Sequence, residues 1–138
     1  MIDFKAQVGM FHIQKNKATS VMNFPAYHCN PVPVTDAMKD AIGADVSDAY
    51  LDRELLLVLE DENTVINLKP DQKKTEQLNG LLVGVTAKGT AYDCVSRIFA
   101  PKMGVPEDSV TGSTHCMITP YWCKKLGKNQ PTCYQTSE

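Results

Sequence analysis

Apolar and polar residues alternate from Ile2 to Val8, and the alternation resumes one position out of phase at Phe11, after Gly9. A period of two is typical of a β-strand with one buried face. A bulge inserts one extra residue into a strand, so a bulge at the glycine accounts for the change of phase. The pattern therefore predicts a long first strand interrupted at Gly9. Residues 15–17 are interpreted as a turn, and the segment TSVMNFP as a returning strand.

The next segment, AYHCNPVPV at 26–34, contains Pro31 and Pro33. Proline has no amide hydrogen to donate to a neighbouring strand, so this segment is predicted to be a loop. Thr35 then has the residue type of a helix N-cap. A short helix is expected from there to Ile42, followed by Gly43 as its stop.

Two apolar runs, ELLLVLE and TVINL, are separated by Asp61, Glu62 and Asn63. Short apolar runs around a polar tripeptide predict a hairpin. The polar segment PDQKKTEQLNG predicts a short exposed helix that Gly80 ends. Two further strands, LLVGVTA and AYDCVSRIFAP, are expected on either side of a turn at 88–89.

The longest helix is predicted from about Ser113 to Leu126, with Gly127 at its left-handed stop and Pro120 inside it. The segment TCYQTS predicts one more strand, for which no partner follows in the sequence. An unpaired strand edge promotes association, so we expect another segment to cover it. The element order predicts an α+β fold, for which a curved, mostly antiparallel sheet around the long helix is one arrangement.

Composition limits the class of protein. The 138 residues suit one domain, 43% are apolar, and the net charge of −2 lacks the basic excess of a nucleic-acid binder. We find neither an apolar run of about 18 residues, as a membrane span requires, nor a secretory pattern after Met1.

The five cysteines are odd in number and form no CxxC pair, and the three histidines have no ligand spacing to them. Reduced thiols, a cytoplasmic location and the absence of a zinc site are the corresponding predictions.

The stretch EDSVTGSTHC, at 107–116, gathers short polar side chains at the start of the longest helix. A helix start presents backbone N–H groups without internal partners and the positive end of the helix dipole. Gly112 leaves space for a carboxylate or phosphate to approach these groups. The same residue types also serve as ordinary helix caps, so composition leaves both interpretations open.

The late part of the chain resembles the PhzF-like family of phenazine-biosynthesis isomerases. The matching motifs are Tyr92-Asp93, Ser96-Arg97, Phe99-Ala100-Pro101, Gly104, Glu107-Asp108, Thr111-Gly112-Ser113, His115, Tyr121-Trp122 and Leu126-Gly127. The earlier pieces MNFP, LLLVLED and LKPD match more weakly. The resemblance covers essentially the whole chain.

The resemblance implies a diaminopimelate-epimerase-like fold, with two similar halves and the active site between them. Residues 1–138 resemble the second half only. The family's first half and its last strands have no counterpart in this sequence. The sequence is therefore predicted to be incomplete, with the first half or a second copy of the chain as its partner.

The resemblance also implies a cofactor-independent proton shift on a small cyclic carboxylic acid. The family's acid/base glutamate lies in the other half. The residues carried over to this chain are Asp108 and Ser113 in catalysis, and Thr111, Gly112, Ser113 and Glu107 in substrate binding. No cofactor and no metal are implied.

Three further residue predictions concern structure. His115 and the aromatic pair Tyr121 and Trp122 are interpreted as core residues. Arg97 is expected to pair with Glu107 or Asp93. Ser109 stands where the family usually has proline, which implies a more mobile loop. Because Ser109-Val110 occupies the place of the thiol in related racemases, a two-thiol mechanism is disfavoured.

Two functions remain open at this point. One is an isomerase domain that is inactive, or nearly so, without its other half. The alternative is a non-catalytic module that binds a small carboxylate or serves in assembly.

Overall fold

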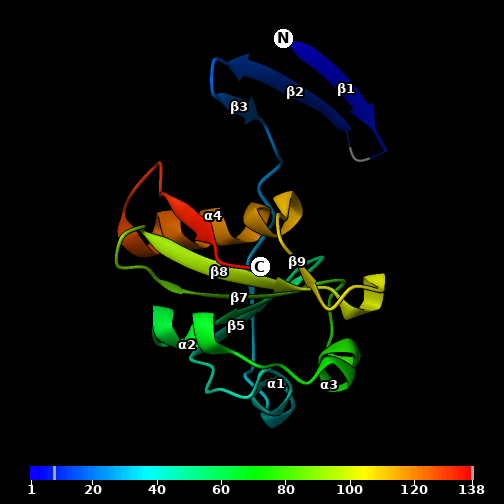
Figure 1. The fold of residues 1–138 in the computed structure, drawn as a ribbon, viewed down its shortest axis with the longest axis vertical. Helices are drawn as coiled ribbons and strands as arrows, with labels where there is room; N and C mark the ends of the chain where they lie inside the picture. The colour runs from blue at the N-terminus through cyan, green and yellow to red at the C-terminus, as the bar shows by residue number, and fades with distance from the viewer. Residues whose placement is uncertain (8, 138) are drawn as a thin grey trace.

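The computed structural model describes residues 1–7 and 9–137 and contains two β-sheets (Figure 1). The first sheet has three strands in the order β1-β2-β3, and the second has seven, in the order β10-β8-β7-β6-β5-β4, with β9 also paired to β8. The strands are β1 (Ile2–Ala6), β2 (Gly9–Asn16), β3 (Thr19–Met22), β4 (Asn30–Val32), β5 (Asp48–Leu51), β6 (Leu55–Val58), β7 (Val83–Lys88), β8 (Cys94–Phe99), β9 (Glu107–Asp108) and β10 (Cys133–Gln135). The helices are α1 (Asp36–Ile42), α2 (Glu62–Asn67), α3 (Gln72–Gln77) and α4 (Gly112–Leu126), with a 3₁₀ turn, η1, at Pro101–Met103.

The prediction of one bulged strand around Gly9 is wrong. β1 and β2 form an antiparallel hairpin in which Ala6 pairs with Gly9. Gly9 has a φ of 135°, which a residue with a side chain rarely adopts, and the chain reverses there. Val8, part of the predicted alternation, lies outside the described residues. The three-stranded sheet stands apart from the rest of the chain, connected to it by the segment after β3 (Figure 1).

The segment predicted as a proline-rich loop contains strand β4, which pairs antiparallel with β5. Pro31 lies opposite Tyr50 in this ladder. β4 is the last strand in the order of its sheet, where a residue without an amide hydrogen costs no ladder bond on the outer side. The prolines therefore place this segment at an edge rather than outside the sheet.

The predicted hairpin around Asp61 is also wrong, because TVINL belongs to helix α2. The Asp61 carboxylate accepts a hydrogen bond from the Thr64 amide at 2.7 Å and caps the helix. β6 pairs instead with β7, in parallel. A short apolar run is too short for its periodicity to distinguish a helix from a strand. Here the Asp61 cap favours the helix.

Several local predictions are confirmed. Thr35 caps α1, and Gly43 ends it with a φ of 73°. α3 occupies the predicted polar segment, although it ends at Gln77 with Leu78 as its C-cap rather than at Gly80. β7 and β8 are the two strands predicted around the turn at 88–89, and they pair antiparallel. α4 covers the predicted long helix and ends at Gly127 with a φ of 65°.

The seven-stranded sheet is covered on both faces. Leu55 and Leu57 of β6 contribute to a cluster with residues of α1 and α2, whereas Leu56 and Val58 contribute to a cluster with α4. Alternate residues of a strand point to opposite faces, so a strand buried on both faces is a continuous apolar run. The arrangement is mixed α+β, as predicted, with α4 on one face and α1 to α3 on the other (Figure 1).

α4 approaches the sheet closely at Gly84 of β7. A Cβ atom at this position would lie 2.7 Å from Thr114 Cγ2. Further along α4, the Trp122 indole N–H donates to Thr86 Oγ1 at 2.9 Å. These contacts fix the position of the helix and therefore of its N-terminus.

The last strand, β10, has a partner that the sequence did not reveal. It pairs in parallel with β8, with Cys133 opposite Cys94. Within the described part of the chain, no helix has both the length and the apolar character needed to cross a membrane.

Candidate functional site

The predicted site lies where β9 leads into α4. β9 pairs with the end of β8, with Asp108 opposite Ile98 and Glu107 opposite Phe99. α4 begins four residues after Asp108, with Thr111 as its N-cap. The seven-stranded sheet and α4 therefore hold the two ends of this short loop.

Glu107 forms a two-point ion pair with Arg97. Arg97 Nε and Nη2 donate to the two carboxylate oxygens, both at 2.8 Å. Arg97 Nη1 also donates to three carbonyls at the end of α2, those of Val65, Ile66 and Leu68. Of the two partners predicted for Arg97, Glu107 is confirmed. Asp93 pairs instead with Lys128, at 2.6 Å. Both oxygens of Glu107 are thus engaged in holding β9 to β8 and α2.

The ion pair predicts a pH dependence. Burial opposes the charged form of Glu107, but hydrogen bonds from Arg97 and Ser137 and the Arg97 charge outweigh it and lower the pKa of Glu107. A lowered folded-state pKa adds stability above the unfolded-state pKa, and this stability is lost as the pH falls through the folded-state value. We expect Glu107→Gln to reduce the free energy of unfolding by about 1–2 kcal/mol at neutral pH. The deficit should shrink as the pH falls below about 4.

Urea unfolding followed by the fluorescence of Trp122, the single tryptophan, measures this difference. Glu76→Gln, on the exposed surface of α3, is the matched control and should leave the free energy of unfolding unchanged at pH 7 and at pH 3. A Glu107→Gln deficit that is the same at pH 7 and pH 3 would contradict the prediction.

Asp108 is bound within its own loop. Its Oδ2 accepts a hydrogen bond from the Thr111 hydroxyl at 2.6 Å. Gln135 of β10 bridges the same loop, since its amide nitrogen donates to the Asp108 carbonyl at 2.6 Å and its amide oxygen accepts from the Thr111 N–H at 2.9 Å. The sequence analysis missed Gln135, because nothing in TCYQTS shows which loop the strand meets.

A cavity of about 330 Å³ opens beside this loop. Asp108, Val110, Thr111, Gly112 and Ser113 form part of its wall. No described residue accepts a hydrogen bond from the N–H of Gly112 or Ser113, and no side chain there caps the helix. The predicted residues other than Glu107 therefore meet at one cavity, with amide donors at its edge.

Arg53, from the connection between β5 and β6, also lines this cavity. Arg53 thus borders the same cavity as Gly112 and Ser113, the first two residues of α4. A cation near the helix start adds to the attraction for an anion. The sequence analysis missed Arg53 because 59 intervening residues separate it from Ser113.

Phe24 approaches the start of α4 from the other side. Its ring atom Cζ would lie 3.1 Å from a Cβ atom at Gly112, so the glycine accommodates the ring. Phe24, Gly112, His115 and Cys116 line a second cavity, of about 260 Å³, between this segment and α4. The prediction that His115 is a core residue is therefore wrong. His115 is half-buried, and its Nδ1 lies 2.7 Å from the Thr111 carbonyl one helical turn earlier.

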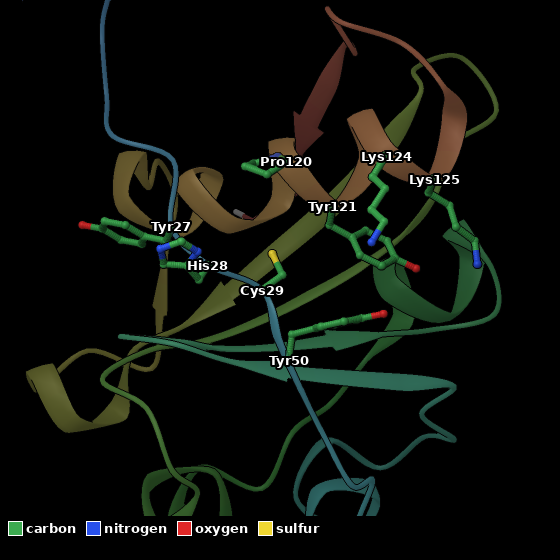
Figure 2. A pocket seen from close by; sticks show the side chains of 8 residues that line it. All are labelled: Tyr27, His28, Cys29, Tyr50, Pro120, Tyr121, Lys124 and Lys125. Atoms are coloured by element: carbon green, nitrogen blue, oxygen red, sulfur yellow. The ribbon is translucent and has the colours of Figure 1, made fainter.

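The cavity of about 530 Å³ in Figure 2 lies at the other end of α4. Lys124 and Lys125, from the last turn of the helix, line it, and the Lys124 side chain points toward the ring of Tyr121 (Figure 2). Cations in the last turn complement the helix dipole, which gives these lysines a structural role. Burial raises the pKa of Tyr121 to about 12. None of the predicted site residues lines this cavity.

Tyr121 and Trp122 are buried, as predicted. Residues 1–7 and 9–137 contain no group of three or more His, Cys, Asp or Glu side chains arranged to hold a metal ion.

The sequence matches the family described as PhzC-PhzF, phenazine biosynthesis-like protein, over residues 7–138. The chain belongs to this family. PhzF-family relatives include an uncharacterized isomerase of Pseudomonas aeruginosa, which is 38% identical over 99% of this chain and 52% of its own length. The phenazine biosynthesis-like domain-containing protein 2 of Mus musculus is 34% identical over 99% of this chain and 54% of its own length.

A crystal structure of a PhzF-family phenazine biosynthesis protein from Enterococcus faecalis has the same fold, with a TM-score of 0.94 and 36% identity. The match covers 99% of this chain and 53% of that chain. A putative PhzC/PhzF protein from Clostridium difficile gives a TM-score of 0.89 at 38% identity, over 99% of this chain and 53% of that one. The chain thus spans about half the length of the relatives it matches.

Proposed function

We propose that the chain is a PhzF-like, cofactor-independent isomerase domain that acts in a proton shift on a small cyclic carboxylic acid. We further propose that it corresponds to the second half of a diaminopimelate-epimerase-like protein, and that it is inactive, or nearly so, without the other half. The observation that carries this proposal is the cavity at the start of α4, where Asp108 and Ser113 adjoin unpaired amides.

In this proposal, the N–H groups of Gly112 and Ser113 bind the substrate carboxylate. Backbone donors at a helix start are already oriented, so they stabilise negative charge without rearranging. The Ser113 hydroxyl and the Asp108 carboxylate assist proton transfer or hold the substrate. Thr111 orients Asp108, and Glu107 holds the loop through Arg97.

The acid/base partner must come from elsewhere. Asp108 is the only carboxylate among the described residues that line the cavity. A proton shift needs a group that removes a proton and one that returns it. The same observation supports the second candidate, a non-catalytic module that binds a small carboxylate and performs no chemistry.

The β1–β3 sheet offers a surface for the other half. Register pairing places Ile2, Ile13 and Met22 in one row and Phe4 and Phe11 in the next, all on one face of the sheet. Ile2 and Phe4 are 65% and 57% exposed. An exposed apolar face of this kind is typical of an interaction surface. We propose that the other half, or a second copy of the chain, covers this face.

Carboxylate binding tests the candidate site on this chain alone, without the proposed other half. In a titration with benzoate followed by amide NMR spectra, the Gly112 and Ser113 resonances should shift most. Ser113→Ala should weaken benzoate binding roughly tenfold, by loss of one hydrogen bond to a charged group. Ser109→Ala, in the same loop but outside the cavity wall, should bind as the wild type does. Shifts elsewhere only would refute the site, and equal binding by both variants would refute the hydrogen bond from the Ser113 hydroxyl.

Turnover tests the claim of inactivity. The purified chain alone, mixed with a dihydro-hydroxyanthranilate-type substrate, should give no fast product formation. Fast turnover in the absence of any other polypeptide would contradict the proposal that the chain is incomplete.

A further inference from the structure

Cys94 and Cys133 face each other across two adjacent strands. Each is the first residue of its strand, and the two are register partners in the parallel pair of β8 and β10. Neighbouring strands lie about 4.7–4.9 Å apart. This spacing falls within the Cα separations of about 4.4–6.8 Å that disulfides span. Both side chains contribute to the cluster that packs against α4, so they point to the same face of the sheet.

The two thiols already interact. A hydrogen bond between them, reinforced by burial, raises the pKa of Cys94. The same hydrogen bond lowers the pKa of Cys133, and a hydrogen bond from Thr119 acts in the same direction. Cys94 is fully buried, whereas Cys133 is half-buried. Cys133 is therefore the more accessible thiol of the pair, and its lowered pKa favours the thiolate that attacks a disulfide.

Two of the other cysteines lack the lowered pKa that Cys133 has. Burial raises the pKa of Cys29 and of Cys116, which keeps both as unreactive thiols. Cys123 is half-buried on α4.

We propose that Cys94 and Cys133 are a modification site that forms an interstrand disulfide with a low-molecular-weight disulfide such as glutathione disulfide as the oxidant. The Cys133 thiolate attacks one sulfur of glutathione disulfide, which forms a mixed disulfide and releases one glutathione thiolate. Cys94 then gives its proton to the released glutathione thiolate, and its sulfur attacks the Cys133 sulfur and releases the second glutathione as a thiolate, which takes up a proton from water. Two protein thiols are oxidised and one glutathione disulfide is reduced to two glutathione molecules.

The bond anchors the strand that holds the candidate site. Gln135 lies two residues after Cys133 on β10 and bridges Asp108 and Thr111. β10 has only three residues and three register pairs with β8. In the reduced protein, main-chain pairing and side-chain contacts alone keep Gln135 in place, whereas the disulfide links its strand covalently to β8. The disulfide thus restrains the loop at 108–111 without touching it.

Peptide mapping tests the pairing. The purified, reduced chain is incubated with glutathione disulfide, its remaining thiols are alkylated, and it is digested without reductant. We expect a loss of two hydrogens from the intact mass and a peptide that links Cys94 to Cys133, with the other three cysteines alkylated. A lasting glutathione adduct, a different pair, or five alkylated cysteines in excess oxidant would overturn the proposal.

Two cysteine variants test whether the loss of two hydrogens comes from the Cys94–Cys133 pair or from any reactive thiol. Cys133→Ser should lose the intact-mass change, whereas Cys123→Ser, the matched half-buried control, should keep it. Amide hydrogen exchange of the wild type tests the anchoring, and it does not depend on Cys133→Ser folding. Exchange at Gln135 and Thr111 should slow at least tenfold on oxidation. An unchanged rate would overturn the anchoring, while benzoate binding by the reduced chain tests the proposed function separately.

Discussion

Replacing Arg97 with methionine is expected to lower the free energy of unfolding by about 3 kcal/mol. Its guanidinium pairs with both oxygens of Glu107 and with three carbonyls at the end of α2. The side chains of Arg97 and Glu107 are 14% and 19% exposed. Removing the cation leaves a largely buried carboxylate without its counter-ion and takes one donor from each of three carbonyls at the end of α2, and each loss carries a desolvation cost. Methionine keeps the length and packing of the stem, so the loss reports on the polar contacts.

Urea unfolding followed by Trp122 fluorescence measures the effect, with Lys39→Met as the matched control. Lys39 pairs with Asp45 at the surface, where the two side chains are 41% and 94% exposed, and exposed pairs contribute little to stability. Adding Glu107→Gln to Arg97→Met should recover part of the loss, because the double variant no longer buries an unpaired charge. If Arg97→Met is as stable as Lys39→Met, or if the double variant is less stable than either single variant, the ion pair does not hold this region.

Asp108→Asn is expected to slow catalysis about 10²- to 10⁴-fold in the chain reconstituted with its other half, the range that general acid–base groups supply. Asparagine keeps an oxygen that accepts the Thr111 hydroxyl bond, so the loop geometry should survive. The loss should therefore appear in kcat, with stability changed by less than about 0.5 kcal/mol. The measurement uses co-expression with the half of the Pseudomonas aeruginosa isomerase that this chain does not match, which is the kind of partner that the proposed function requires.

Asp45→Asn is the matched control, because Asp45 is 94% exposed and lies outside the candidate site. It should retain full activity. Asp108→Asn that retains activity within twofold, in a complex with normal stability, would remove Asp108 from the mechanism. An active complex that binds benzoate but tolerates this change would leave the carboxylate site in place and assign the proton transfer to other residues.

Local sequence signals predicted the helix ends well. Thr35, Gly43 and Gly127 act within one turn of the chain, and their caps depend on the backbone of near neighbours alone. The start of α4 and the motif around it were predicted for the same reason. The hairpin predicted around Asp61 failed because a five-residue apolar run fits both a strand and a short helix, and the Asp61 cap was not weighed.

The strand partners could not be predicted in this way. Pro31 has the local character of a loop, and only the neighbouring β5 makes an edge strand of it. Cys133 and Cys94 are 39 residues apart, and no pattern within either segment indicates that they are paired. Whether Arg97 meets Glu107 or Asp93 depended on β9 folding back onto β8.

The sequence by itself determined the family, the α+β class and the loop that carries Asp108, Thr111, Gly112 and Ser113, because these depend on residue type and spacing along the chain. The tertiary structure alone decided that Arg53 and Gln135 reach this loop, that Glu107 is occupied by Arg97, and that His115 borders a cavity. Contacts between distant segments depend on how strands pair and how closely α4 packs on the sheet. Both follow from the burial of apolar surface by the whole chain rather than from any short stretch of it.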